Sequence, residues 1–261
     1  MHINLADQHH RGSSLIHRLD PRTKLIGTLL FIVAATVLPP GAWLPYGLLF
    51  AASLVVAQRT GLGTGFALRR SFVALPFALA AITLPFTVPG EGLARLGPLT
   101  ISAEGLVRFA SILIKSWVSV QMAILMTYTT AFPELLWGLR ALRLPPTLVA
   151  IISFMYRYLF VLADEALRLT RARAARSGAG ADRRRTGGGV VWRGKVAGGM
   201  VGNLTLRAFE RSERIHDAMV ARGYQGEMRM LDTPHLHDAD RSALVGWVTF
   251  LAMTLLIGFV F

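Results

Sequence analysis

Long apolar runs recur along this chain, and they constrain its fold more than any other feature. Residues 106–131 and 243–261 are each long enough to cross a bilayer as a helix, and the second run has no charged residue. The chain as a whole is 53% hydrophobic and only 16% charged, which is more apolar than one soluble core of 261 residues requires. The sequence therefore predicts a membrane protein.

The first two apolar runs predict a helical hairpin. Residues 25–38 end at a Pro-Pro turn, and residues 43–57 follow at once. The basic stretch before the first run also resembles a secretory signal peptide, but the immediate second run favours the hairpin. Asp20 followed by Pro21 is typical of a helix N-cap and a first helical position. The first helix is therefore expected to begin before Lys24.

The distribution of basic residues predicts the orientation. The chain has 28 Lys and Arg against 15 Asp and Glu, a net charge of +13, and most of the basic residues lie between positions 132 and 240. Cytoplasmic loops of membrane proteins are rich in Lys and Arg. This segment is therefore expected to face the cytoplasm, in a multi-pass protein of the cell (inner or plasma) membrane with a cytoplasmic N-terminus and a C-terminus outside.

One apolar run leaves the number of spans open. Residues 147–163 are apolar, but Arg157 lies in their middle. A charge at the centre of a bilayer costs about 2.5–3.5 kcal/mol on insertion scales. We therefore expect a cytoplasmic or interfacial helix that runs on to about Arg176, with a further crossing as the alternative.

A second cytoplasmic helix is predicted after a flexible connector. Residues 178–189 contain mainly Gly and Arg and have no apolar anchor, which is typical of a linker. From Val201 to Met219, apolar and small residues recur at spacings of three and four, which predicts an amphipathic helix. Gly223 would supply the left-handed residue that ends this helix.

Motifs of catalysis and nucleotide binding do not occur. The sequence contains no GxxxxGK[ST] phosphate loop and no Ser-His-Asp, HExxH or GxSxG pattern. It also has no cysteine, which excludes disulfides, thiolate zinc sites and a cysteine nucleophile. Neither a catalytic residue nor a bound ATP is therefore expected in this chain. Lys115 and Gln121 are the only polar candidates found in the spans, too few for an intramembrane enzyme.

Two other kinds of site have weak support. His235 and His237, with Asp232, Asp238 and Asp240, could ligate a divalent metal, but flexible surface histidines are commoner and no metal site is expected. Residues 183–185 are three consecutive arginines, the only local feature that suggests nucleic-acid binding. The expected surroundings of the chain are a lipid bilayer and protein partners, and no nucleic acid.

Both helices of the basic segment end in a similar signature, which is Ala175, Arg176 and Ser177 in the first and Ala221, Arg222 and Gly223 in the second. A single Arg at such a place complements the negative end of its helix, an effect of about 0.3–1 kcal/mol. Two of them in one cytoplasmic segment would present two guanidinium groups to the cytosol. The planar guanidinium binds carboxylates bidentately and stays charged. The pair therefore indicates docking on an acidic groove of a partner.

Five ordered motifs cover nearly the whole chain. They are LDPRTK at 19–24, FPEL at 132–135, LRLP at 142–145, YRY at 156–158 and ERIHDAMVARGYQG at 213–226. In this order they resemble the transmembrane T components of energy-coupling factor (ECF) transporters, the CbiQ/EcfT family, and within it the cobalt type. The resemblance assigns a scaffold role to Asp20, Pro21, Arg22, Lys24, Pro133, Glu134, Arg157, Glu213 and Arg214.

The resemblance implies a membrane scaffold that works with two kinds of partner. A dimer of cassette ATPases (CbiO-like) would bind ATP and dock on the two Ala-Arg-Gly-like motifs, and a separate membrane subunit (CbiM-like) would capture the substrate. This chain itself would bind no cofactor. Ser177 stands where the family has Gly, and Arg173 is the alternative position for the first motif.

The expected fold is all-α, a polytopic membrane protein with about five transmembrane helices and a cytoplasmic pair of long amphipathic coupling helices. Residues 1–131 would form a membrane region with four transmembrane helices, residues 132–242 the cytoplasmic coupling region, and residues 243–261 the last transmembrane helix. The expected function is that of a non-catalytic subunit of an ATP-driven importer, passing the closure of the ATPase dimer to the substrate subunit. Cobalt ion is the expected substrate, and nickel or a vitamin is the alternative.

Overall fold

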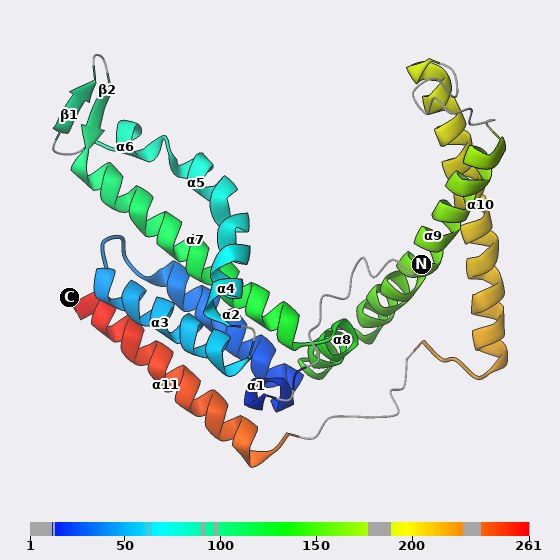
Figure 1. The fold of residues 1–261 in the computed structure, drawn as a ribbon. Helices are drawn as coiled ribbons and strands as arrows, with labels where there is room; N and C mark the ends of the chain where they lie inside the picture. The colour runs from blue at the N-terminus through cyan, green and yellow to red at the C-terminus, as the bar shows by residue number, and fades with distance from the viewer. Residues whose placement is uncertain are drawn as a thin grey trace. The chain divides into compact units, whose positions relative to one another are not determined.

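The computed structural model describes residues 12, 14–61, 63–89, 92–96, 99–176, 189–226 and 236–260. These residues fall into two compact units (Figure 1). The bundle unit contains the described parts of 7–142 and 232–261, and the helix-pair unit contains the described parts of 143–231. The first cytoplasmic residues expected from the sequence, 132–142, thus pack with the bundle unit.

The described residues are almost entirely helical, which confirms the all-α class. The bundle unit contains α1 (Leu15–Arg18), α2 (Pro21–Val37), α3 (Trp43–Arg59), α4 (Thr64–Arg70), the 3-10 helix η1 (Ser71–Ala74), α5 (Leu75–Ala81), α6 (Leu84–Thr87), α7 (Ala103–Thr129), α8 (Phe132–Ala141) and α11 (Asp238–Val260). The helix-pair unit contains α9 (Pro146–Arg176) and α10 (Val190–Ala221).

A short β-hairpin precedes α7, where a loop over residues 89–105 is expected from the sequence. Strands β1 (Gly92–Leu96) and β2 (Leu99–Ser102) pair antiparallel, with Leu96 opposite Leu99. Ser102 then begins α7 as its N-cap, because its hydroxyl accepts a hydrogen bond from the Gly105 amide.

Side chains of opposite charge cap the two ends of α2. At the start, the Asp20 carboxylate accepts a hydrogen bond from the Arg22 amide at 2.8 Å, and Pro21 occupies the first helical position, as predicted. At the end, the Lys115 ammonium of α7 donates to the carbonyl oxygens of Thr36, at 3.1 Å, and Leu38. An anion at the N-terminus and a cation at the C-terminus both complement the helix dipole.

The core of the bundle unit lies among α2, α3, α7 and α11. Phe31 is fully buried and stacks on Trp247 of α11, with the ring centroids 5.8 Å apart. The Trp247 indole N–H donates to the Gly27 carbonyl at 3.0 Å, which ties α11 to α2. Between α3 and α7, the buried Ser53 hydroxyl donates to the Gln121 side-chain oxygen at 3.1 Å. Both polar side chains that the sequence located in the spans, Lys115 and Gln121, therefore make interhelical contacts.

The apolar run at residues 72–88, which follows the first two runs in the sequence, is broken into short helices. Pro76 and Pro85 lie at the beginnings of α5 and α6, where a missing amide hydrogen costs little. The two arms of this segment are bent by 50°. A Cβ added to Gly105 of α7 would lie 2.6 Å from the Leu84 carbonyl oxygen, so α6 approaches α7 at a place that only glycine allows.

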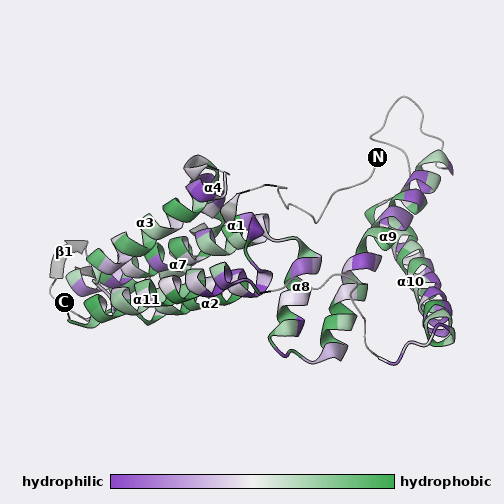
Figure 2. Cartoon of the chain, turned by 90° about the horizontal axis from the view of Figure 1, so that it is seen from below, coloured by the Kyte–Doolittle hydropathy of each residue, from purple (hydrophilic) through white to green (hydrophobic). Residues whose placement is uncertain are grey.

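Three described helices are long and apolar enough to cross a membrane: α7, α9 and α11. The bent segment from α4 to α6 makes four if it counts as one span. The sequence predicts about five, including α2 and α3. Those helices have 17 residues each, about 26 Å, slightly less than a hydrocarbon core of about 30 Å. Hydrophobic residues dominate α3 and α11, whereas polar and apolar residues alternate on α10 (Figure 2).

The composition of the first half of α9 fits both a membrane span and a helix at the membrane surface. A cytoplasmic or interfacial helix is expected there because of Arg157, with a crossing as the alternative, and α9 qualifies as a span by length and hydropathy. The helix is continuous from Pro146 to Arg176, as expected from the sequence. Arg157 is exposed on its surface.

Candidate partner-docking site

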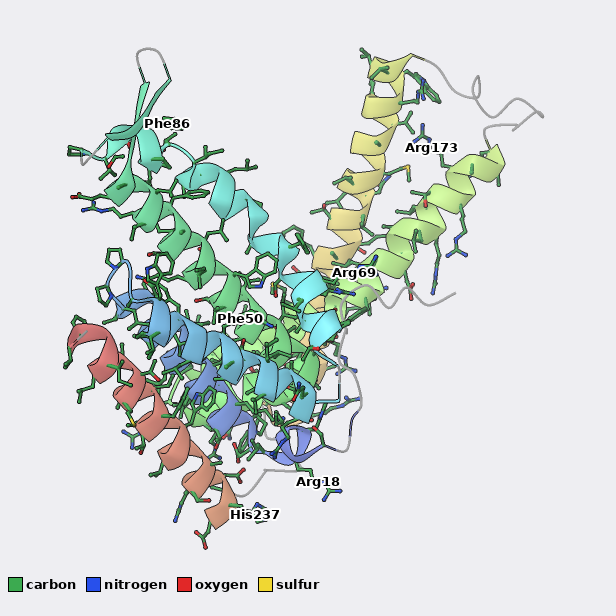
Figure 3. All side chains as sticks on the ribbon, turned by 60° about the vertical axis from the view of Figure 1, so that its left-hand side comes forward. Arg18, Phe50, Arg69, Phe86, Arg173 and His237 are labelled. Atoms are coloured by element: carbon green, nitrogen blue, oxygen red, sulfur yellow. The ribbon has the colours of Figure 1, made fainter. Side chains whose placement is uncertain are left out.

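The helices α9 and α10 form an antiparallel pair. Near the end of α9, the Arg173 guanidinium lies 5.9 Å from the centroid of the Trp192 ring, near the start of α10. Figure 3 shows Arg173 between the two helices. Earlier in α9, Glu165 forms ion pairs with Arg207 and Arg211, which lie later in α10. The two helices therefore run in opposite directions alongside each other.

The two predicted docking arginines lie at opposite ends of this pair. Arg176 is the last residue of α9, and Arg222 is the C-cap of α10. Both are exposed, as are Ala175 and Ala221. At a rise of 1.5 Å per residue, the stretch of α10 from Trp192 to Arg222 is about 45 Å long. The structure therefore presents two separate arginine tips; Ser177, the last residue of the first motif, lies outside the described residues.

The end of α10 has the geometry that its sequence predicts. Gly223 has a φ of +85°, the left-handed conformation that favours glycine. The Tyr224 amide donates to the Met219 carbonyl and the Gly223 amide to the Val220 carbonyl, at 3.0 and 2.9 Å. This is the Schellman arrangement, and it aims the chain away from the helix directly after Arg222.

Arg173 and Arg176 differ in their surroundings. Arg173, the alternative residue for the first motif, is partly covered and lies against the Trp192 ring within its own unit. Arg176 is exposed at the end of the helix. The geometry therefore favours Arg176 as the residue that is accessible to a partner.

The N-terminal motif and the FPEL segment meet in the bundle unit. The Arg22 guanidinium lies 4.2 Å from the centroid of the Trp137 ring in α8. A Cβ added to Gly138 would lie 3.5 Å from the backbone of Pro21, so α8 packs closely on the start of α2. Pro133 and Glu134 are exposed in the first turn of α8. The two motifs thus form one structural unit in which the first turn of α2 is held by α8.

Lys24 connects three helices at the same end of the bundle. Its ammonium donates to the carbonyl oxygens of His17, at 3.0 Å, and of Thr129 at the end of α7, at 3.1 Å. The side chain also lines a mainly apolar cavity of about 160 Å³, together with Met122 and Trp247. Lys24 is therefore a structural link between α1, α2 and α7.

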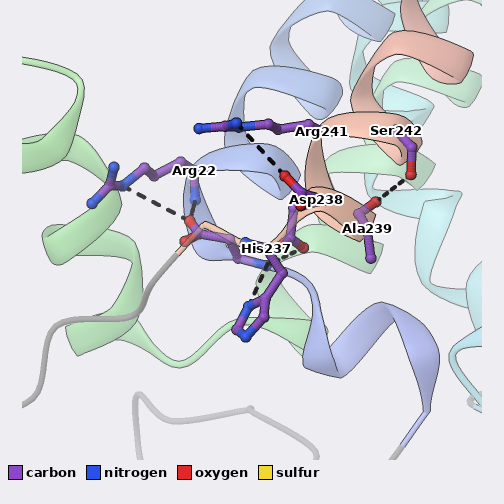
Figure 4. Close-up of polar contacts among 8 residues, drawn as sticks. Arg22, His237, Asp238, Ala239, Arg241 and Ser242 are labelled. Carbon is purple, nitrogen blue, oxygen red and sulfur yellow. Dashed lines mark hydrogen bonds and ion pairs between the residues drawn. The ribbon is translucent and has the colours of Figure 1, made fainter.

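Asp240 is the residue of this region that the sequence analysis missed. It is 4% exposed, and one carboxylate oxygen accepts from the Asp20 amide at 3.1 Å, the other from the His237 amide at 3.0 Å. The neighbouring Asp238 and Arg241 form only a surface ion pair, at 3.6 Å (Figure 4). From the sequence, Asp240 is only a possible metal ligand. It is the third residue of α11, where capping contacts are made, but the sequence predicts this last helix only from residue 243 and therefore gives no signal for the cap.

The other residues with an expected scaffold role lie in the helix-pair unit. Arg157 is exposed on α9, and Glu213 and Arg214 are exposed on α10. They therefore belong to a different unit from the group around Asp20. Next to them, α9 and α10 enclose an apolar groove of about 430 Å³, lined by residues that include Phe154, Tyr158, Ile215, Met219 and Tyr224.

Within the part of the chain that the structure describes, no group of three or more His, Asp or Glu side chains is placed to hold a metal ion. His237 instead pairs with Asp240, with the ring nitrogen 3.8 Å from the carboxylate. Asp238 pairs with Arg241, and His235 and Asp232, the remaining members of the possible ligand set, lie outside the described residues.

Comparison with known proteins assigns the chain to a family. The CbiQ family, described as cobalt transport protein, matches residues 12–231. The chain is 32% identical over 217 residues to the cobalt transport protein CbiQ of Rhodobacter capsulatus, and the match covers 80% of each protein. It is 31% identical over 225 residues to the energy-coupling factor transporter transmembrane protein EcfT of Bacillus subtilis, and the match covers 82% of each protein. The EcfT protein of Acidaminococcus fermentans is 29% identical over 261 residues, 97% of this chain and 94% of the relative.

These matches include every motif on which the resemblance was based. The chain has the apolar helices of a multi-pass membrane protein, and it is similar to transporter components along most of its length. The chain therefore belongs to the CbiQ/EcfT family, the transmembrane components of energy-coupling factor transporters.

Proposed function

We propose that this chain is the non-catalytic coupling subunit of an ATP-driven importer. Its helix pair docks on a dimer of CbiO-like cassette ATPases, and the chain passes their closure to a CbiM-like membrane subunit that captures the substrate. ATP is bound by the ATPases, and this chain binds no cofactor. The N-terminus and the helix-pair unit lie on the cytoplasmic side.

The observation that supports docking is the pair of exposed arginine tips. Arg176 and Arg222 end two long helices, and each tip lies at a different end of the antiparallel pair. A guanidinium at an exposed helix end is free to bind a carboxylate on a partner with two parallel hydrogen bonds. The tips lie at opposite ends of a helix pair in which the stretch of α10 from Trp192 to Arg222 alone is about 45 Å long, so they suit one groove on each of two subunits better than a single acidic groove.

Mechanical coupling follows from this spacing. If each tip is held by a different ATPase, a closing movement of the dimer changes the distance between the two docking grooves. Two helices joined by side-chain contacts respond by changing their crossing angle. The pair therefore converts closure of the ATPases into a movement at the membrane surface, which would tilt the substrate subunit until its site faces the cytoplasm.

Cobalt ion is the proposed substrate. The matching family and the relative from Rhodobacter capsulatus are both named for cobalt transport, whereas the relatives named EcfT have no substrate in their names. Nickel or a vitamin is the alternative. Uptake of radioactive cobalt by cells that express the complete transporter, in competition with nickel, would distinguish the two metals.

A pull-down in detergent tests the docking proposal. Wild-type chain is expected to capture both members of the host's cassette ATPase pair, identified by mass spectrometry, and the Arg176→Glu/Arg222→Glu variant to capture neither. Each single variant should retain only weak binding, because one tip remains. Size-exclusion chromatography of each variant before the pull-down verifies its folding.

The matched control is Arg168→Glu/Arg193→Glu. Both of these arginines are exposed on the same two helices, and the change of charge is identical. We expect the control to capture the ATPases as the wild type does. Equal loss in both double variants would mean that the overall positive charge, and not the two tips, attracts the partner, and the docking proposal would be wrong.

A further inference from the structure

The contact between α9 and α10 contains little buried apolar surface. Among the 32 residues of α10, none is buried, and in α9 only Val149 and Ala150 are. Phe209 is 66% exposed and Leu206 is 64% exposed, although both lie in the middle of α10. Helix pairs in globular proteins are normally held by interdigitating apolar side chains. Here polar contacts must make a larger contribution to the crossing geometry.

Glu165 is at the centre of those polar contacts. One carboxylate oxygen lies 3.3 Å from a terminal nitrogen of Arg207, and the other lies 3.3 Å from a terminal nitrogen of Arg211. The two arginines are four residues apart and therefore lie on one face of α10. The Glu165 side chain is only 19% exposed, so its charge is partly removed from water and its position is restricted.

The position of Glu165 along the pair matters for the two tips. On one side of it, Arg173 packs on Trp192 and leads to Arg176. On the other side, the apolar groove around Tyr158 and Met219 leads to Arg222. A carboxylate held by both arginines at this point limits sliding of one helix along the other, because a slip by one turn would leave only one of the two arginines beside it.

We infer that Glu165 is a positioning residue, which sets the crossing of α9 and α10 and thereby the distance between the docking arginines Arg176 and Arg222. This inference rests on the proposed function for its role in transport, whereas its geometric part concerns this chain alone. Glu165 acts through Arg207 and Arg211.

The absence of cysteine from the sequence allows a direct measurement of the geometry. Spin labels on cysteines introduced at Ala172 of α9 and Ala218 of α10, both exposed, report the distance between the helices in the full chain in nanodiscs. Glu165→Arg is expected to shift and broaden the distance distribution, because it opposes Arg207 and Arg211 with a like charge. The reversed set, Glu165→Arg with Arg207→Glu and Arg211→Glu, should restore the wild-type distribution.

Capture of the cassette ATPases by the same variants connects geometry to docking. We expect Glu165→Arg to weaken capture of the ATPase pair at least about fivefold, the lower end of typical coupling between distant sites. The reversed set should recover it. Glu210→Arg is the matched control, since Glu210 is exposed on α10 and the change of charge is the same. It should leave both the distance and the capture unchanged.

The outcomes separate this inference from the proposed function. An unchanged distance in Glu165→Arg, or no recovery in the reversed set, would overturn the positioning role even if docking is confirmed. A changed distance with full capture would show that docking does not depend on the crossing, which also overturns it. If wild-type chain captures no ATPase, the proposed function fails, and the distances still decide whether Glu165 sets the crossing.

Discussion

The carboxylate of Asp240 accepts a hydrogen bond from the backbone amide of Asp20, which lies 220 residues earlier in the chain and 3.1 Å away. Asp20 is the N-cap of α2, and its amide would otherwise be a buried donor without a partner. The other oxygen of the Asp240 carboxylate accepts a hydrogen bond from the His237 amide at the start of α11. In a capping box, the side chain of the third helical residue accepts from the N-cap amide of its own helix, as Asp240 does from His237. Here one carboxylate joins the first turns of α2 and α11.

Asp240→Ala should destabilise the bundle unit by about 2–3 kcal/mol, because it leaves two backbone amides without an acceptor and removes a cap. Thermal unfolding in detergent, followed by circular dichroism, measures the effect. Asp238→Ala is the control: that side chain is fully exposed and forms only a surface ion pair with Arg241, so a change below about 1 kcal/mol is expected. Equal effects of the two variants would contradict the capping role.

Lys115→Met should destabilise the same unit by about 1–3 kcal/mol, since the carbonyl oxygens of Thr36 and Leu38 lose their donor. The same unfolding measurement applies. Arg108→Met removes a positive charge from an exposed position of the same helix and should have little effect. A Lys115→Met variant that is as stable as wild type, but inactive in transport, would instead assign the ammonium to the transport step.

Glycine substitutions in the helix-pair unit should have opposite effects at two positions. Gly223→Ala forces a residue with a Cβ into a φ of +85° and should cost about 1–2 kcal/mol at the end of α10. Gly202→Ala lies inside α10 with nothing near the added methyl group, and it should stabilise the helix by up to about 1 kcal/mol. Hydrogen exchange of α10 amides measures both changes. Faster exchange in Gly202→Ala would show that the glycine has another role.

Arg143 is the single non-glycine residue with a positive φ, +67°, in the described part of the chain, and it lies where the bundle unit gives way to the helix-pair unit. Arg143→Gly should therefore raise stability by about 0.5–1 kcal/mol, because glycine adopts this conformation without a steric penalty. Arg143→Ala retains the penalty and should be neutral. The midpoint of thermal unfolding distinguishes these results. A destabilised Arg143→Gly would indicate that the arginine side chain itself stabilises the junction.

Features whose cause lies within a few residues could be predicted from the sequence alone. Asp20 and Pro21 begin α2, Gly223 ends α10, and the apolar spacing from Val201 to Met219 forms a helix, as expected. Each depends on the hydrogen bonds and torsions of one helix turn, so the local sequence contains the whole cause. The family also followed from the ordered motifs.

The tertiary structure decided the contacts between residues that are distant in sequence. Asp240 with Asp20, Lys115 with Leu38, and Glu165 with Arg207 are separated by 220, 77 and 42 residues. No local pattern distinguishes these charged side chains from others on the same helices, such as Asp238 or Glu210. Only the packing of one helix on another determines which polar groups lose water and therefore require a partner. For that reason the sequence by itself determined the long helices and the arginines at their ends, whereas the structure determined the β-hairpin, the breaks after α4 and what holds the helices together.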